Sequence, residues 1–120
     1  MTLQQRAELL ADFIMYCKKE IKIKTLPKIE FTTDNKWARK THAMGQYENE
    51  TQVIIVYIKN RNLADICRTL AHELTHNKQN EDKLLYKNSG KTGSDVENEA
   101  HIISSIIMRN YGLKHPEIYE

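Results

Sequence analysis

Residues 72–76 read HELTH, and their types and spacing are well suited to chemistry. On a helix, positions i and i+4 lie about 40° apart, so His72 and His76 would project from one face, one turn apart. Two imidazoles at this separation can bind one Zn²⁺ at about 2.0–2.1 Å. Glu73 lies beside them and can act on water at the open coordination position as a general base. The spacing therefore predicts a zinc site with His72 and His76 as ligands and Glu73 as the catalytic carboxylate.

A third protein ligand is expected, because catalytic zinc usually takes three and leaves a fourth position for water. The segment SDVENEAHIIS, residues 94–104, opens a helical pattern that can fold back along the HELTH helix. Its candidate ligands are Asp95, Glu97, Glu99 and His101. On a helical wheel Glu97 falls at the margin of the apolar stripe, next to the small residues Ala100 and Ser104, which permit close helix approach. Glu99 falls further from the stripe, so the geometry favours Glu97.

Glu97 also has a purely local interpretation. Ser94 and Glu97 have the spacing of a capping box, in which the Glu97 carboxylate would bond back to the Ser94 N–H. The HELTH motif upstream favours Glu97 as the third ligand. Glu99, Asp95 and His101 stay open as alternatives.

Three other patterns are set aside. SGKTG at 89–93 contains a GKT, but a phosphate-binding loop needs a glycine five residues before Gly90, and position 85 is Leu85. Cys67 lies about 140° around the helix from His72, which favours a core position over a ligand. His42 is expected to be a partly exposed strand residue.

The two motifs together resemble a known clan of zinc peptidases. HELTH, followed some twenty residues later by Glu97-x-x-Ala100-His101, is similar to the HExxH and ExxA(D/N) signatures of gluzincins, which include the CAAX prenyl endopeptidases and the ImmA/IrrE-type peptidases. The resemblance implies that Glu97 is the third zinc ligand and that His101 stands where an Asp or Asn usually supports a ligand histidine. The small size and element order most resemble the minigluzincins, single-domain versions of this catalytic core.

Hydrophobic periodicity predicts the elements that would hold these residues. They are a helix over 3–20, strands over 28–33, 37–47 and 53–58, and helices over about 63–78 and 94–111. The expected fold is α+β: an N-terminal helix packed on a small three-stranded sheet, then the HExxH helix and a C-terminal glutamate-bearing helix, in one zincin-like domain over 1–120.

Single residues sharpen this prediction. Gly45 suggests a bulge or a close backbone approach in the second strand. The apolar run 53–58, VIIVYI, indicates a strand covered on both faces. Ser94 is expected to cap the last helix, and Gly112 to end it.

Composition limits the partners. The chain has 120 residues, a net charge of +2 and 28% charged residues, which is too weak a bias to predict nucleic-acid binding. No segment is apolar over the length of a membrane span, and we expect a cytoplasmic monomer. Cys17 and Cys67 are expected to be buried, reduced thiols.

The predicted activity is hydrolysis of peptide bonds in a protein or peptide substrate, with zinc as cofactor and Glu73 transferring the proton. The gluzincin resemblance implies that an edge strand, expected within Thr41–Tyr47, holds the substrate in extended form. Tyr111 is about 21 Å along the helix from Glu97, too far to act on the same metal. One alternative is a zinc-binding regulatory domain of the anti-repressor kind, with little or no proteolysis. Another is a metal-free structural domain.

Overall fold

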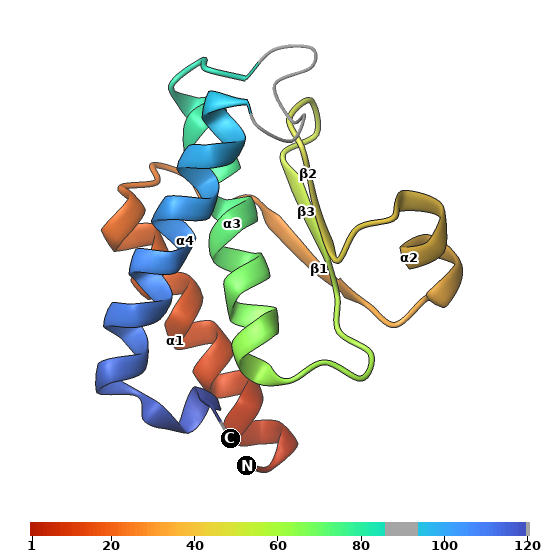
Figure 1. Ribbon diagram of the computed structural model, residues 1–120, viewed down its shortest axis with the longest axis vertical. Coiled ribbons are helices and arrows are strands. Elements are labelled where there is room, and N and C mark those ends of the chain that lie inside the picture. The colour runs from red at the N-terminus through yellow and green to blue at the C-terminus, as the bar shows by residue number, and fades with distance from the viewer. Residues whose placement is uncertain (86–93, 120) are drawn as a thin grey trace.

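The computed structural model describes residues 1–85 and 94–119, which form four α-helices, three strands and one 3₁₀-helix (Figure 1). In chain order these are α1 (Leu3–Ile21), β1 (Lys28–Thr32), α2 (Asn35–Thr41), β2 (Gly45–Glu48), β3 (Val53–Tyr57), α3 (Leu63–Glu81), α4 (Asp95–Lys114) and η1 (Pro116–Tyr119). The predicted α+β class is confirmed, with an N-terminal helix, a three-stranded sheet and two further long helices. Helix α2 was not predicted.

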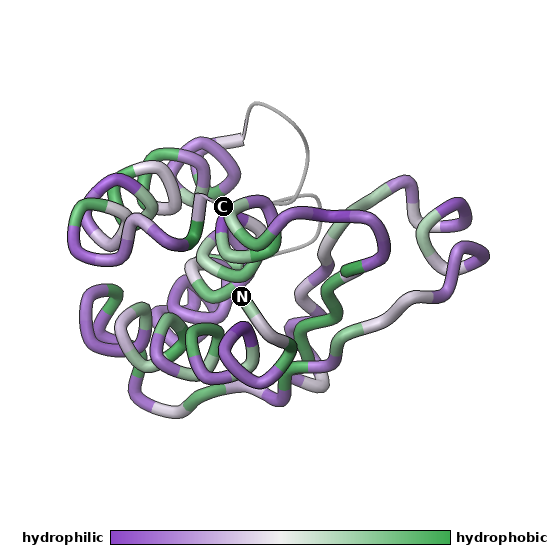
Figure 2. The backbone as a smooth tube through the Cα atoms, turned by 90° about the horizontal axis from the view of Figure 1, so that it is seen from below, coloured by the Kyte–Doolittle hydropathy of each residue, from purple (hydrophilic) through white to green (hydrophobic). Residues whose placement is uncertain are grey.

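The sheet has the strand order β1-β3-β2, so β3 is central. Strand β1 runs parallel to β3, and β2 runs antiparallel to it. Ile54 and Val56 are fully buried, whereas Val53, Ile55 and Tyr57 are only partly covered. The expectation that this strand is covered on both faces is therefore correct for one face only. Figure 2 shows the reason: the three long helices lie on the same side of the sheet, and α2 stands apart from them.

Helix α3 is the central element of the fold. It contacts α1, α4 and strands β2 and β3. Its apolar stripe packs against the buried face of α1, which presents Leu9, Phe13, Cys17 and Ile21. At the C-terminal end of α4, the Tyr111 ring meets the Phe13 ring edge-on, with centroids 5.0 Å apart. Because α3 is held on three sides, the HELTH residues that it carries have a rigid support.

The prediction of one strand over residues 37–47 is wrong for the first half of that segment. Residues Asn35–Thr41 form α2, and only Gly45–Glu48 pair as a strand. Asp34 caps α2 by accepting a hydrogen bond from the Lys36 N–H, and His42 ends it in the left-handed region at φ 53°. Local capping at both ends thus outweighs the weak alternation of apolar and polar residues.

Ser94 caps α4 as predicted, but Gly112 does not end it, because the helix continues to Lys114. Gly112 is needed for space instead. A Cβ there would lie 2.6 Å from Cε2 of Tyr119, whose hydroxyl donates to the Met108 carbonyl. The absence of a side chain therefore lets η1 fold back against α4.

Both cysteines are free and fully buried, as predicted. Burial raises the pKa of the Cys67 thiol to about 12 and raises that of Cys17 as well. Since the thiolate is the reactive form, neither should react with iodoacetamide at pH 8 in the folded protein, and both should react in urea. Mass spectrometry of the alkylated protein checks this. Rapid labelling of the native protein would contradict the packing of α1 against α3.

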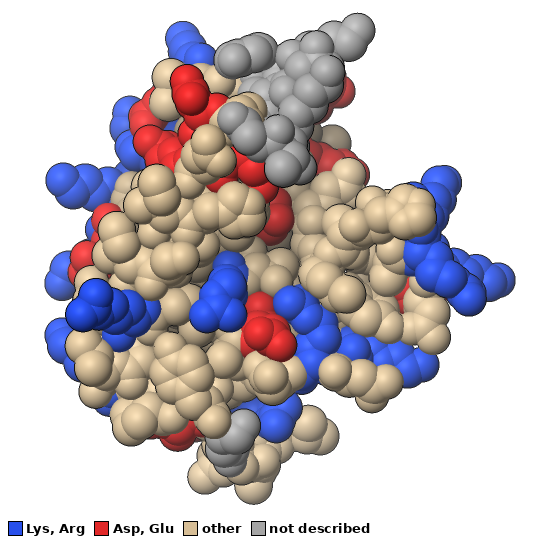
Figure 3. All heavy atoms as spheres, in the orientation of Figure 1, with Lys and Arg blue, Asp and Glu red and all other residues tan. Residues whose placement is uncertain are grey.

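Within residues 1–85 and 94–119, no helix is both long and apolar enough to cross a membrane. Figure 3 shows side chains of both charge signs on one face of the molecule, with basic ones over α2 and acidic ones near the start of α4. Helix α2 contributes Lys36, Arg39 and Lys40. On this face the largest basic group and the largest acidic group therefore lie over different elements.

Candidate metal centre

Helix α3 places His72 and His76 one turn apart, as the spacing predicts. Their ring centroids are 4.8 Å apart and their planes are nearly perpendicular. Both side chains are largely buried, with exposed fractions of 14% and 11%. Burial lowers the pKa of His72, although the Glu97 carboxylate opposes this effect. A neutral imidazole is the form that binds a metal.

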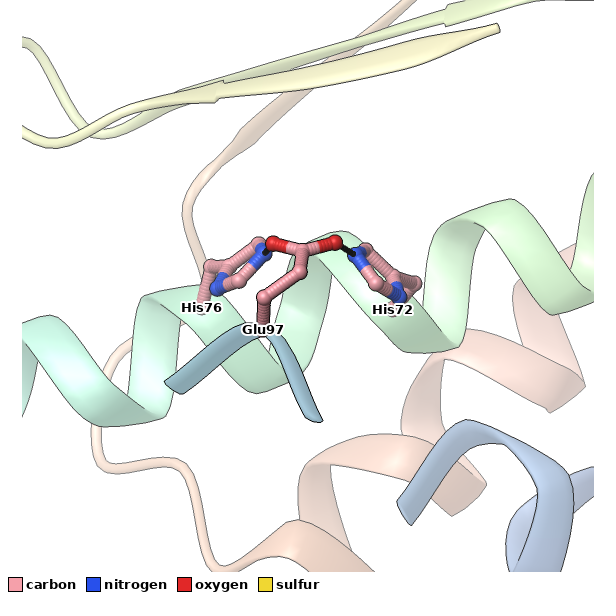
Figure 4. Close-up of side chains that lie close together, drawn as sticks. All are labelled: His72, His76 and Glu97. Carbon is pink, nitrogen blue, oxygen red and sulfur yellow. Dashed lines mark ion pairs between the residues drawn. The ribbon is translucent and has the colours of Figure 1, made fainter. Parts of the chain in front are cut away.

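Glu97 reaches the two histidines from the first turn of α4. Its Oε1 lies 2.7 Å from Nε2 of His72, and its Oε2 lies 3.1 Å from Nε2 of His76. Figure 4 shows the carboxylate between the two rings, with one oxygen toward each. The Glu97 N–H meanwhile donates to the Ser94 hydroxyl at 3.3 Å. The Glu97 N–H thus takes part in the helix cap, whereas the Glu97 carboxylate is directed to the two histidines.

The three side chains lie close enough together to hold a metal ion. One ligand atom from each of His72, His76 and Glu97 can be chosen so that all lie within 4.8 Å of one another. Ligands at about 2.0–2.1 Å from a tetrahedral zinc would lie about 3.4 Å apart. The distances from the Glu97 oxygens to the two histidine nitrogens, 2.7 and 3.1 Å, are close to this value. Two imidazoles and one carboxylate could therefore hold a metal ion here.

Glu73 lies next to this group but is not part of it. Its side chain is buried under strand β2, where a Cβ on Gly45 would lie 3.3 Å from both its Cγ and its Oε2. Burial, and to a lesser degree the nearby Glu97 charge, raise the pKa of Glu73 from 4.5 to about 8. A carboxyl with this pKa can exchange a proton near neutral pH, as a general base must.

The remaining candidates on α4 take different positions. Nε2 of His101 lies 3.4 Å from Oε1 of Glu97, and its ring is 4.6 Å from that of His72. The His101 side chain is nevertheless 66% exposed, so it lies at the rim of the site. Asp95 is exposed, and Glu99 accepts a hydrogen bond from Gln79. Neither belongs to the three-residue group, which holds Glu97.

The residues set aside from the sequence lie away from the three ligand candidates. His42 is exposed at the end of α2, and Cys67 is in the core. Tyr111 donates its hydroxyl hydrogen bond to Asp12 at the far end of α4. The SGKTG segment, residues 89–93, lies outside the described part of the chain.

Sequence reasoning missed Gln79. Its Oε1 lies 2.8 Å from Nδ1 of His76, and its Nε2 donates to the Val96 carbonyl and to Glu99, both at 2.9 Å. A signal was present, because position 79 follows His76 by three residues and His72 by seven, on the same helix face. Nothing in the spacing alone distinguishes this amide from a surface glutamine.

Strand β2 is tied to α3 beside the site. The Tyr47 hydroxyl donates to Asn77 at 3.1 Å and accepts from Asn80 at 2.9 Å. Gly45 lies above Thr69 and Glu73, which confirms the expected close backbone approach.

Comparisons of the chain with known protein families, with curated proteins and with solved structures find no match.

Proposed function

We propose that this chain is a zinc-dependent endopeptidase of the gluzincin type. The observation that carries the proposal is the meeting of His72, His76 and Glu97 beside the buried carboxylate of Glu73. Pure metal binding would need only the first three. A buried carboxylate with a raised pKa next to them has a use in proton transfer.

Zinc is the metal that this donor set suits best. Two imidazoles with one carboxylate form the ligand set of a catalytic zinc site with one open position. When bound, Zn²⁺ lowers the pKa of water toward about 7 and polarises a carbonyl oxygen. His72, His76 and Glu97 would hold the ion, because two different helices aim their ligand atoms at one point.

Glu73 would act as the general base and then as the general acid. It would remove the proton from the attacking water and deliver it to the nitrogen of the departing amine. Its burial under β2 keeps bulk water from competing for that proton. The same burial raises its pKa, so that both transfers are possible near neutral pH.

Strand β2 is the proposed substrate-binding edge. Among the described strands it pairs with β3 alone, and the Tyr57 N–H donates to the Met44 carbonyl. Since hydrogen bonding alternates along an antiparallel strand, Gly45 and Tyr47 would turn their backbone groups to the free edge. An extended peptide added there would pass directly above Glu73. This supports the expectation that the edge lies within Thr41–Tyr47.

The first experiment measures metal content and cleavage together. Purified wild-type protein should bind stoichiometric zinc and cleave a peptide library, and a chelator should stop cleavage until zinc is restored. Loss of a residue that is hydrogen-bonded to a metal ligand typically lowers metal affinity by about 10- to 100-fold. His76→Ala removes a proposed ligand itself, so it should lower zinc affinity by more than that. Full zinc stoichiometry in His76→Ala would show that the site is misplaced. Absence of zinc from the wild type would favour a metal-free structural domain.

A zinc-binding regulatory domain is the second candidate. His101 favours it, because its imidazole lies 3.4 Å from Glu97, where the signature that the sequence resembles has an Asp or Asn. Zinc binding by the wild type without cleavage of any library peptide would support this alternative.

A further inference from the structure

Gln79 is buried between the two helices that carry the proposed ligands. Its side chain is 1% exposed. It accepts at Oε1 from His76 on α3, and it donates from Nε2 to Val96 and Glu99 on α4. One amide therefore contacts a ligand histidine, the backbone next to Glu97 and a second carboxylate.

These partners determine which way the amide faces. The Val96 carbonyl can only accept, so the atom 2.9 Å from it must be the Gln79 NH₂ group. The Gln79 oxygen then faces Nδ1 of His76, and because that oxygen can only accept, Nδ1 must carry a proton. The other ring nitrogen, Nε2, is directed to Glu97 at 3.1 Å. The reversed amide would place two acceptors against each other.

We propose that Gln79 is a positioning residue that holds His76 with Nε2 directed at the metal, and that Glu99 in turn holds Gln79. This inference rests on the proposed zinc site. A hydrogen bond to the outer nitrogen of a ligand histidine orients the ring and makes it a stronger ligand. Glu99, rejected above as a ligand, thereby gains a role behind His76.

The same amide also sets the spacing of α3 and α4. Val96 directly precedes Glu97, so the bond from Gln79 to the Val96 carbonyl fixes the first turn of α4 where the carboxylate leaves it. Loss of Gln79 would affect both the orientation of His76 and the approach of Glu97. We therefore expect a larger effect from Gln79 than from Glu99.

Zinc affinity of Gln79→Leu tests the proposal, measured by competition with a chromophoric chelator. Leucine fills a similar volume and offers neither donor nor acceptor. The zinc Kd should rise by about 10- to 100-fold. In proton NMR spectra of the zinc-loaded protein, the His76 Nδ1 proton should exchange faster with water. The double variant Gln79→Glu, Glu99→Gln keeps an acceptor toward His76 and a donor at position 99, but it loses the hydrogen bond to the Val96 carbonyl. It should therefore recover only part of the lost affinity.

Asn77→Leu is the matched control. Asn77 is another buried amide on α3, and its side-chain hydrogen bonds go to Tyr47 and to the Thr25 carbonyl instead of to a proposed ligand. Both variants should lower the thermal stability of the metal-free protein, but only Gln79→Leu should weaken zinc binding. A Kd for Gln79→Leu that rises no more than that of Asn77→Leu overturns the inference. If the wild type binds no zinc, the proposed function itself fails, which is a different result.

Discussion

Glu73→Gln is expected to abolish most hydrolysis while making the metal-free protein more stable. Loss of a general base typically costs about 10²- to 10⁴-fold in rate, so kcat/KM should fall by that factor. Zinc content should not change, since Glu73 is not one of the three ligand candidates. Stability should rise because the variant no longer buries an ionisable carboxylate whose pKa is raised to about 8.

The pH dependence of the unfolding free energy follows from the direction of the Glu73 pKa shift. The folded protein binds the Glu73 proton more tightly than the unfolded chain, whose pKa is near 4.5. The stability contributed by this group is therefore complete below about pH 4.5 and is lost as the pH rises through about 8. At pH 7 the ionisable carboxyl costs the folded wild type about 3 kcal/mol, at about 1.4 kcal/mol for each pKa unit.

Thermal unfolding of chelator-treated proteins measures this effect. The difference in unfolding free energy between Glu73→Gln and the wild type should grow from pH 4.5 to pH 8, because glutamine does not titrate. At pH 7 we expect about 2 kcal/mol, somewhat below the full cost because the glutamine amide must also find partners. Zinc should reduce the difference, since its charge favours the ionised carboxylate. Equal cleavage rates of the two proteins would exclude Glu73 as the base.

The parts of the site that were predictable from the sequence are those that depend on one helix. His72 and His76 are brought together by helix geometry alone, so their spacing was sufficient. The Ser94 cap is likewise local, and it is present. Glu97 required an inference about how α4 packs against α3, and small neighbours on its face supplied it. The structure places its carboxylate on both histidines.

The parts that were missed depend on several elements at once. Gln79 has its role only because α4 brings Val96 and Glu99 to it. Helix α2 is held by caps at Asp34 and His42, whose geometry a hydrophobic pattern does not report. Gly112 was predicted to end a helix, but its lack of a side chain instead leaves space for the Tyr119 ring from η1. Each of these depends on contacts that only the folded chain supplies.

Gly45→Ala is expected to disable the site without changing any catalytic residue. A Cβ at position 45 would lie 2.3 Å from Cγ2 of Thr69, whereas two carbons in contact prefer about 3.5–4.0 Å. The backbone of Gly45 is extended and has no left-handed φ, so space is the only obstacle to alanine. Thr69 cannot rotate freely, because its hydroxyl accepts a hydrogen bond from Arg61 at 2.7 Å.

Strand β2 must therefore move away from α3, and Glu73 loses its cover. Overpacking of this kind costs about 1–3 kcal/mol of stability, which thermal unfolding would measure. A displacement of about 1 Å between substrate and base can cost about 100-fold in rate, so kcat/KM should fall by about that amount. Zinc affinity should stay near that of the wild type, since the ligands lie on α3 and α4 and none lies on β2.

Thr69→Ser separates this steric cause from any other effect of alanine. Serine removes Cγ2 and keeps the hydroxyl that Arg61 requires, so the single variant should resemble the wild type. In Gly45→Ala, Thr69→Ser the collision is gone, although the 3.3 Å contacts with Glu73 persist. Stability should then return almost fully. The value of kcat/KM should recover only in part, because the remaining close contacts are with Glu73, the proposed base. If the double variant is as damaged as Gly45→Ala alone, the close approach of β2 to Thr69 does not explain the glycine. If Gly45→Ala and the double variant both cleave peptides as fast as the wild type, β2 does not hold the substrate over Glu73.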